Sequence, residues 1–229
     1  MTPPLRSTRP GGALHRVGRA ADAWAWPDWA FAGDDGTFGN RYDDPDGDYR
    51  VLYASSSRLG AFLEVLARYR TDPALVAEYA EITLDDDEHP TIAPGVVPGD
   101  WPAHRHVGTA THPGPFADVG HSDSLVHLRA AMAGRLLHHG LDDLDAGDLR
   151  RRAPRAFTQE LSRYIFEHGV DADGVSLIGV RYLSRLGDDL ENWAIFEGTE
   201  PSDTTSAPLT DNDVDLAAAL TKLDLTLGE

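Results

Sequence analysis

The sequence predicts a mixed α+β fold in one substantial domain. Segments with strand character and segments with helical periodicity follow one another irregularly, without the repeated strand–helix–strand order of a parallel α/β sheet. No internal repeat with a period of about 20–50 residues is present. The chain has 229 residues, of which 41% are hydrophobic and 25% charged, a composition typical of a globular protein with a sizeable core.

Turn formers and tryptophans dominate the first fifty residues. Residues 1–12 are rich in Pro, Gly and Arg, and we expect them to form a flexible N-terminal arm. WAWPDWAF (24–31) holds three of the five tryptophans. Because Pro27 prevents a regular helix, we expect an extended segment that packs its aromatic rings on the core. Residues 33–50 carry turn chemistry on both sides of a short strand predicted near Asn40–Tyr42.

A buried strand and a capped helix are predicted next. YRVLYASSS (49–57) has the character of a strand and ends in hydroxyl residues, of which Ser56 or Ser57 is placed to cap a helix. The apolar residues after the cap fall on one helical face: Leu59, Phe62, Val65, Leu66 and Tyr69. TDPALVAEYAEI (71–82) begins with a cap and a proline, which predicts a second helix.

The second half of the chain predicts further helices and a hairpin. Residues 83–103 are acidic and then Pro-rich, which indicates a loop, and short strands are expected at 105–112 and 116–120. Capping residues and helical periodicity predict helices over residues 121–140, 155–169 and 211–223. GVRYLSRLGDDLENWAIFE (179–197) predicts two strands joined by a Gly-Asp-Asp loop.

The charge and the lack of cysteine exclude several function classes. The formal net charge is −18, from 38 acidic and 20 basic residues. This argues against broad binding to nucleic acid or to anionic lipid, although one or two local arginines suffice to hold a phosphate. Without cysteine there is no disulfide, thiolate catalysis or cysteine-ligated zinc. Since we find neither a signal peptide nor a window with the ~20 apolar residues of a spanning helix, we expect a cytoplasmic protein.

Polar residues surround the tip of the predicted hairpin. Ser184 and Arg185 follow its first strand, and Asn192 begins its second. Taken singly, Ser184 and Asn192 fit the opening and closing of a turn, and Arg185 fits a pair with Asp188 or Asp189.

Two other charged residues have both a structural and a functional interpretation. Glu64 lies away from the apolar stripe of its helix, which is typical of a solvated carboxylate and also suits a helix face beside a cleft. Arg41 stands between two acidic turns and fits a surface ion pair worth only ~0–1 kcal/mol.

The remaining motifs predict neither a metal site nor a phosphate-binding glycine loop. Four histidines lie close in sequence: His104, His106, His112 and His121. Histidines in loops beside prolines are typically solvated, so we expect no metal there. DDPDGD (43–48) lacks the ligand pattern of an EF-hand loop and is interpreted as a turn, and GGALHRVG (11–18) lacks the spacing of a dinucleotide fingerprint.

Three separated motifs nevertheless form a recognisable pattern: GNRYDDPDGDYRVLYAS (39–55), FLEVL (62–66) and GVRYLSRLGDDLENWAIFE (179–197). In order, spacing and strand context they resemble the RES-domain family, which is named for its Arg, Glu and Ser. The resemblance implies a RES domain at 13–198, preceded by the arm and followed by a C-terminal segment with one helix at 199–229.

The resemblance implies an ADP-ribosyltransferase-like fold, in which a split sheet flanked by helices surrounds an NAD cleft. Characterised members of the family are toxins of bacterial toxin–antitoxin pairs that destroy NAD by phosphorolysis or hydrolysis of the nicotinamide–ribose bond. The implied protein is an enzyme with NAD as substrate, inorganic phosphate as a co-substrate in the first case, and no separate cofactor. An antitoxin protein is the implied partner, and we expect a homodimer.

The resemblance also assigns residues. The family's arginine, glutamate and serine fall on Arg41, Glu64 and Ser184, which are the implied catalytic residues. The implied substrate-binding residues are Tyr42, Tyr53, Asn192 and Arg185. Chemically, Glu64 suits stabilisation of an oxocarbenium ion, Arg41 suits an NAD diphosphate or inorganic phosphate, and Ser184 suits orientation by hydrogen bonding.

The two tyrosines, Tyr42 and Tyr53, suit stacking on nicotinamide or adenine. Transfer of ADP-ribose to a macromolecule and non-catalytic binding of a nucleotide are the alternatives to NAD cleavage.

Overall fold

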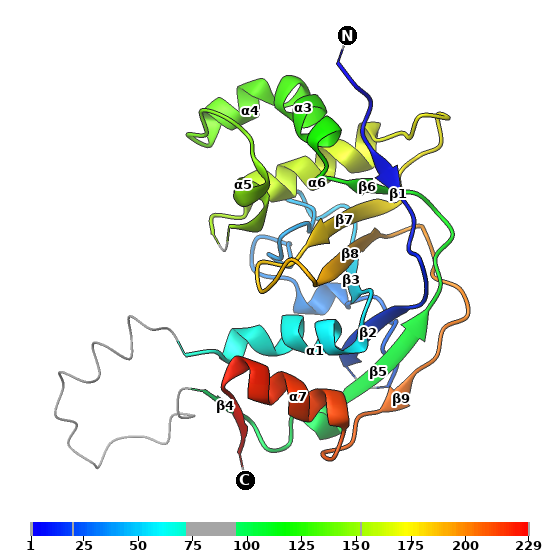
Figure 1. The fold of residues 1–229 in the computed structure, drawn as a ribbon, viewed down its shortest axis with the longest axis vertical. Helices are drawn as coiled ribbons and strands as arrows, with labels where there is room; N and C mark the ends of the chain where they lie inside the picture. Colours follow the sequence, from blue (N-terminus) through cyan, green and yellow to red (C-terminus); the bar gives the residue numbers. More distant parts are fainter. Residues whose placement is uncertain (1, 20, 72–94, 152, 229) are drawn as a thin grey trace, which may run out of the picture.

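The computed structural model describes residues 2–19, 21–71, 95–151 and 153–228. From residue 72 on, the helix predicted over 71–82 lies outside the described residues, as does most of the loop predicted over 83–103. In the described ranges, eight strands form one sheet in the order β1-β6-β7-β8-β3-β2-β5-β9, and β4 pairs with β10 in parallel. Helices cover this mixed sheet (Figure 1), so the predicted α+β class is confirmed.

The strands are β1 (Ser7–Thr8), β2 (Leu14–Arg19), β3 (Val51–Ser55), β4 (Val96–Val97), β5 (Arg105–Ala110), β6 (Phe116–Asp118), β7 (Gly179–Leu183), β8 (Glu191–Phe196), β9 (Ala207–Pro208) and β10 (Thr226–Leu227). The α-helices are α1 (Arg58–Leu66), α3 (Ser122–Ala131), α4 (Ala133–His138), α5 (Ala146–Arg150), α6 (Ala156–His168) and α7 (Val214–Leu223). Short 3-10 turns are η1 (Trp29–Phe31), η2 (Ala67–Tyr69) and η3 (Pro102–His104). None of these helices is long and apolar enough to cross a membrane.

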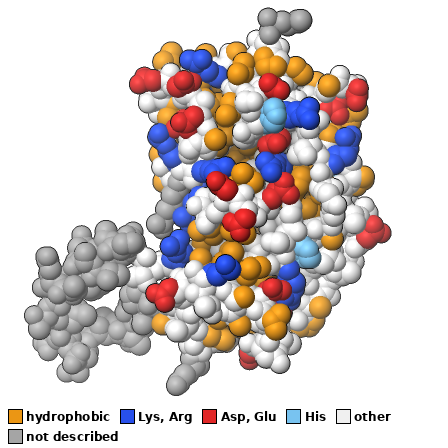
Figure 2. Space-filling model, viewed as in Figure 1, with side chains coloured by type: hydrophobic (Ala, Val, Ile, Leu, Met, Phe, Trp, Pro, Cys, Tyr) orange, Lys and Arg blue, Asp and Glu red, His pale blue; other side chains and the backbone are white. Residues whose placement is uncertain are grey.

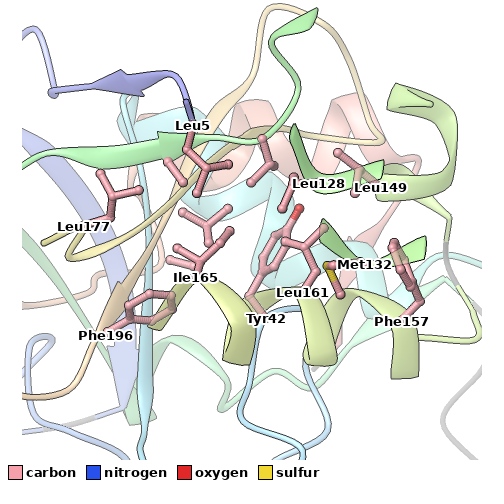
Figure 3. Packing of buried hydrophobic residues seen from close by; sticks show 14 of the residues in the cluster. Leu5, Tyr42, Leu128, Met132, Leu149, Phe157, Leu161, Ile165, Leu177 and Phe196 are labelled. Atoms are coloured by element: carbon pink, nitrogen blue, oxygen red, sulfur yellow. The ribbon is translucent and has the colours of Figure 1, made fainter. Parts of the chain in front are cut away.

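The alternation of side chains along the strands gives the sheet two apolar faces. On β8, Ala194 and Phe196 belong to one hydrophobic cluster, whereas Trp193 and Ile195 belong to another on the opposite face. The first face packs against helical residues that include Leu128, Met132, Leu149, Phe157, Leu161 and Ile165 (Figure 3). The second face is covered in part by Trp24 of the Trp-rich segment, as expected, whereas Trp29 and Phe31 lie in a 3-10 turn and are exposed.

A second group of helices covers another part of the first face. The pairs Tyr53↔Ala194 and His15↔Ser55 place Val17, two residues after His15, on the same side of the sheet as Ala194. Val17 packs in a cluster with residues of α1 and α7. Figure 1 shows α3 to α6 toward the N-terminus at the top and α1 with α7 below, so the middle of this face lies between two helical groups.

The sheet is weakest in the middle. Strands β2 and β3 share a single register pair, His15↔Ser55. Beyond this pair the guanidinium of Arg16 on β2 bridges the two strands, because its Nη1 donates to the Tyr53 carbonyl of β3 at 2.8 Å. Its Nε donates to the Ala23 carbonyl at 2.7 Å. The expected split sheet is therefore one continuous sheet in the described residues, with a narrow junction reinforced by an arginine.

Most predicted elements form close to their expected positions. Ser57 caps α1 by accepting a hydrogen bond from the backbone N–H of Gly60. The strands β3, β5 and β6, the hairpin of β7 and β8, and the helices α6 and α7 are confirmed within a few residues.

Three local predictions are wrong. Residues 40–42 form a turn and no strand, because the Asp43 carboxylate accepts hydrogen bonds from the backbone and side-chain N–H groups of Asn40. The helix predicted over 121–140 is two helices, since Met132 leaves helical geometry with φ −110° and ψ 17°. The N-terminal arm is held down by burial of Leu5 and by pairing of β1 with β6.

Candidate functional site

A large cavity lies where the two helical groups leave the sheet uncovered. It has a volume of about 650 Å³ and is lined by residues of β2, β3, α1 and the β7–β8 hairpin. Among the residues singled out in the sequence, Arg41, Tyr53, Glu64, Arg185 and Asn192 line it. Residues separated by more than a hundred positions therefore share one site.

Glu64 is the centre of a small hydrogen-bonded group. Its helix buries Phe62 and Leu63 against the core, which leaves Glu64 half-buried at the cavity wall. The Ser184 hydroxyl donates to Glu64 Oε1, and Asn192 Nδ2 donates to the same oxygen at 2.9 Å. Both donors therefore bind the same carboxylate oxygen, Oε1, and neither of them binds the second oxygen.

The hairpin positions these two donors. Asn192 lies on β8, flanked by Ser55 of β3 and Tyr182 of β7 in register, so its backbone is held from both sides. The Ser184 N–H donates to the Leu190 carbonyl at 2.8 Å, which closes the loop. The hydroxyl of Ser184 and the amide of Asn192 at the hairpin tip thus both bind the Glu64 carboxylate on α1.

Ser184 and Asn192 differ in their access to the cavity. Ser184 is 2% exposed and is absent from the cavity lining, and its hydroxyl is directed to Glu64. Asn192 does line the cavity, and its buried Oδ1 has no hydrogen-bond partner in the described structure. An unpaired buried acceptor of this kind costs about 1–3 kcal/mol.

Arg41 is held by the end of a short helix. Its guanidinium donates to the carbonyl of Leu149 and, at 3.2 Å, to the carbonyl of Arg150, the last two residues of α5. The Arg150 side chain pairs at 2.5 Å with Asp188 in the hairpin loop, one of the two carboxylates considered for Arg185. Helix α5, which was not predicted, thus connects Arg41 with the hairpin.

The tyrosines have supporting positions. The Tyr42 ring is fully buried in the main hydrophobic cluster (Figure 3), where it packs on Tyr182 with ring centroids 4.8 Å apart. The Tyr42 ring therefore has no exposed face for the predicted stacking on a substrate ring, because the turn at 40–43 directs it into the core. Tyr53 lines the cavity, but its hydroxyl donates to Asp43 at 2.7 Å and accepts from the Tyr42 N–H at 3.0 Å.

Tyr182 was missed in the sequence. It lines the cavity, and burial together with the nearby Glu64 charge raises its pKa well above the ordinary tyrosine value. Burial and the Asp43 charge do the same to Tyr53. Both phenols therefore remain protonated, and the Tyr53 hydroxyl donates to Asp43. The signal was present, since Tyr182 precedes Ser184 by two residues in the predicted hairpin, a spacing that puts two side chains on the same side of a strand.

Seven arginines give this cavity, called here the arginine-lined cavity, a strongly positive wall: Arg16, Arg19, Arg41, Arg68, Arg105, Arg155 and Arg185. Glu64 is the one carboxylate among the described lining residues. In Figure 2, Lys and Arg side chains gather on the left-hand side of the molecule at the level of the hairpin tip. The local charge is thus opposite to the net charge of −18, which favours an anionic ligand.

The four histidines considered for a metal site have separate environments. His121 caps α3, and His112 packs edge-on against Phe116. His104 lies near Asp100 on the surface, and His106 lies 3.2 Å from the Ser206 hydroxyl. In the part of the chain that the structure describes, no group of three or more His, Asp or Glu side chains is arranged to hold a metal ion.

The family model of the RES domain matches residues 13–217. The chain belongs to the RES-domain family. This confirms the resemblance, and the match continues beyond the expected end at residue 198 into the first residues of α7. The RES domain is associated with NAD-related toxin activity, and membership indicates an NAD-processing enzyme. A comparison with curated proteins gives no match.

Proposed function

We propose that this RES-domain protein cleaves the nicotinamide–ribose bond of NAD in the arginine-lined cavity. The observation that carries the proposal is the carboxylate of Glu64, fixed by Ser184 and Asn192 and surrounded by arginines. A fixed carboxylate stabilises positive charge on a sugar, and the arginines attract the diphosphate of a dinucleotide.

The bond to be broken needs little acid catalysis. The C–N bond breaks with both electrons moving to the nicotinamide nitrogen, which neutralises the cationic ring and leaves oxocarbenium character on the ribose. Glu64 balances that developing charge from the oxygen that its protein donors leave available. Water or inorganic phosphate then adds to the ribose carbon and loses a proton, which gives ADP-ribose or ADP-ribose 1″-phosphate.

The other residues position the substrate and the carboxylate. Arg41 presents a planar guanidinium that is already oriented by two carbonyls of α5, so little entropy is lost when it binds a diphosphate or an acceptor phosphate. The unpartnered Oδ1 of Asn192 gives a ribose hydroxyl or an amide N–H an acceptor after a small local movement.

The test is incubation of the purified protein with NAD in phosphate buffer and in phosphate-free buffer, with products resolved by mass spectrometry. We expect nicotinamide with ADP-ribose 1″-phosphate in the first case if phosphate is the acceptor, and nicotinamide with ADP-ribose in both cases if water is. Glu64→Gln should lower kcat at least ~100-fold, the scale for one electrostatic contact in a transition state.

A matched control is Glu167→Gln, which removes a carboxylate that pairs with Arg163 on the surface of α6. It should leave the rate within about twofold, because exposed ion pairs contribute little. Wild-type protein that releases no nicotinamide above a buffer blank would contradict the proposal. Label appearing on a macromolecule in place of free ADP-ribose would instead favour ADP-ribosyl transfer.

A further inference from the structure

Three of the cavity arginines form a group of their own, the three-arginine cluster of Arg19, Arg68 and Arg105. Arg19 on β2 and Arg105 on β5 stand directly opposite each other in register. Arg68 in η2 joins them from the end of the helix that carries Glu64. Like charges that face each other across two strands are destabilising, so this arrangement costs the folded protein free energy.

The carboxylates of the described residues do not neutralise the cluster. Eight other arginines form ion pairs with Asp or Glu: Arg50, Arg58, Arg129, Arg135, Arg150, Arg151, Arg163 and Arg181. No such pair involves a member of the cluster in the described ranges. Burial and the charges of Arg19 and Arg68 lower the pKa of Arg105, which records the same repulsion.

Aromatic rings hold the three guanidiniums in place. Arg19 lies over Phe31 at 4.9 Å, Arg105 over Trp101 at 5.1 Å and Arg68 over Tyr69 at 5.5 Å from the ring centroids. Arg105 donates once, to the His104 carbonyl at 3.0 Å. A guanidinium that rests on a ring keeps its N–H groups at the edge, where they are directed to a ligand.

Two members of the cluster, Arg19 and Arg105, lie apart from the group around Glu64, whereas Arg68 follows Glu64 by four residues. Strands β2 and β5 are the second and third strands from β8 in the sheet, and β8 carries Asn192. At ~4.8 Å per strand, the backbones of Arg19 and Arg105 are roughly 10–14 Å from that of Asn192. Phosphate that attacks the ribose must sit beside Glu64, so this distance favours a group at the far end of an extended dinucleotide.

We infer that the three-arginine cluster binds a phosphate monoester on the adenosine end of the dinucleotide, so that the protein accepts NADP as well as NAD. Three guanidiniums match the two negative charges of a monoester better than the single charge on each phosphorus of a diphosphate. The inference rests on the proposed function, which places the nicotinamide ribose beside Glu64. It adds a subsite that prefers a 2′-phosphate.

Binding of fragments tests the subsite without turnover. Isothermal titration calorimetry in phosphate-free buffer compares adenosine 2′,5′-bisphosphate, ADP and inorganic phosphate on the full chain. We expect the bisphosphate to bind at least ~10-fold more tightly than ADP, a difference of one charged contact. Arg68→Gln and Arg105→Gln should each remove most of that preference.

The matched control is Arg129→Gln. It removes the same charge from α3, where Arg129 forms a surface ion pair with Asp143. It should keep the preference. Arg105 lies over Trp101, and its substitution could unfold the protein. Arg68 is exposed, so Arg68→Gln reports on binding even in that case.

Three results would overturn the inference. Equal weakening of ADP and the bisphosphate in the variants would assign the cluster to the diphosphate. Inorganic phosphate that binds through Arg105, without a preference for the bisphosphate, would assign it to the free anion. If the variants bind all three probes as tightly as the wild type does, the cluster binds none of them. A preserved bisphosphate preference in a protein that does not cleave NAD would contradict the proposed function and leave the subsite standing.

Discussion

At the scale of single residues, Ser184 is distinguished from the other polar groups of the site by its burial. Its hydroxyl accepts the N–H of Leu186 at 3.0 Å and donates to Glu64, so both of its roles are internal. Arg41, in contrast, lines the cavity. A substitution at Ser184 should therefore affect catalysis, and one at Arg41 should affect binding.

Ser184→Ala should lower kcat for NAD cleavage by roughly 10–100-fold, since a hydrogen bond to a charged group contributes about 1.5–3 kcal/mol. KM should stay within about twofold, because the hydroxyl does not line the cavity. Steady-state kinetics measure both constants. Ser184→Thr retains the hydroxyl and should recover part of kcat. A raised KM with unchanged kcat would show that Ser184 contacts the substrate instead.

Motif residues and packing residues differ in how far the sequence predicts them. The resemblance to the RES-domain family implied that Arg41, Glu64 and Asn192 belong to one site, and all three line the cavity. The burial of Tyr42 was not expected, since an aromatic residue between two acidic turns gives no periodicity from which to infer a face. Nor was the three-arginine cluster, in which strand pairing sets Arg19 opposite Arg105 and η2 brings Arg68 to the same cavity.

At the scale of elements, Arg58 joins α1 to α7 by pairing with Asp213 and Asp215. Asp213 caps α7 by accepting hydrogen bonds from the N–H groups of Asp215 and Leu216 at 3.0 and 3.1 Å. The same carboxylate pairs with Arg58, the first residue of α1. Arg58 holds the pKa of Asp213 below the ordinary aspartate value.

Asp213→Asn should destabilise the protein by about 1–2 kcal/mol at pH 7, from the weakened cap and the lost ion pair. A lowered folded pKa means that the carboxylate contributes stability above the unfolded value of about 3.9 and loses it as the pH falls through the folded pKa. The difference from wild type should therefore be smaller at a pH below the folded pKa than at pH 7.

Urea unfolding at both pH values measures this dependence. Asp211→Asn, at an exposed position two residues earlier, is the control and should change stability little at either pH. A destabilisation by Asp213→Asn that persists undiminished at the lower pH would show that the charge of Asp213 is not its cause.

Elements with end signals were predictable and elements without them were not. Helices α1, α6 and α7 carry apolar stripes with caps or a stopping glycine, so their positions followed from local rules. β2 was missed because its sequence, LHRVGR, has few apolar residues; its stability comes from pairing with β5 along its full length. Tertiary pairing of this kind is not encoded in any short window.

At the scale of the whole molecule, the cavity follows from the way helices cover the sheet. Two helical groups pack on one face, and the strip between them holds the narrow β2–β3 junction. Residues from both groups and from the middle strands of the sheet meet there, and they give a chain of charge −18 a positive site. Among the described lining residues Glu64 is the one carboxylate, so the arginines attract a dinucleotide at short range.

The C-terminal segment belongs to this architecture and does not form a separate appendage. Leu216, Ala219 and Leu223 of α7 are buried in the same cluster as Phe62 and Leu66 of α1. Strand β9 extends the sheet beside β5, and β10 pairs with β4. Helix α1, which carries Glu64, is therefore held between the sheet and α7.

Truncation after residue 198, the expected end of the RES domain, should abolish cooperative folding. It exposes the apolar face of α1, and the loss of several buried side chains at about 2–5 kcal/mol each exceeds the 5–15 kcal/mol that stabilises a typical domain. Solubility, near-UV circular dichroism and urea unfolding measure the outcome. Leu216→Ala in the full chain should lose about 2–5 kcal/mol and still unfold cooperatively. A truncated protein with a native spectrum and intact NAD cleavage would place the end of the functional domain before β9, because α7 would then be dispensable for positioning Glu64.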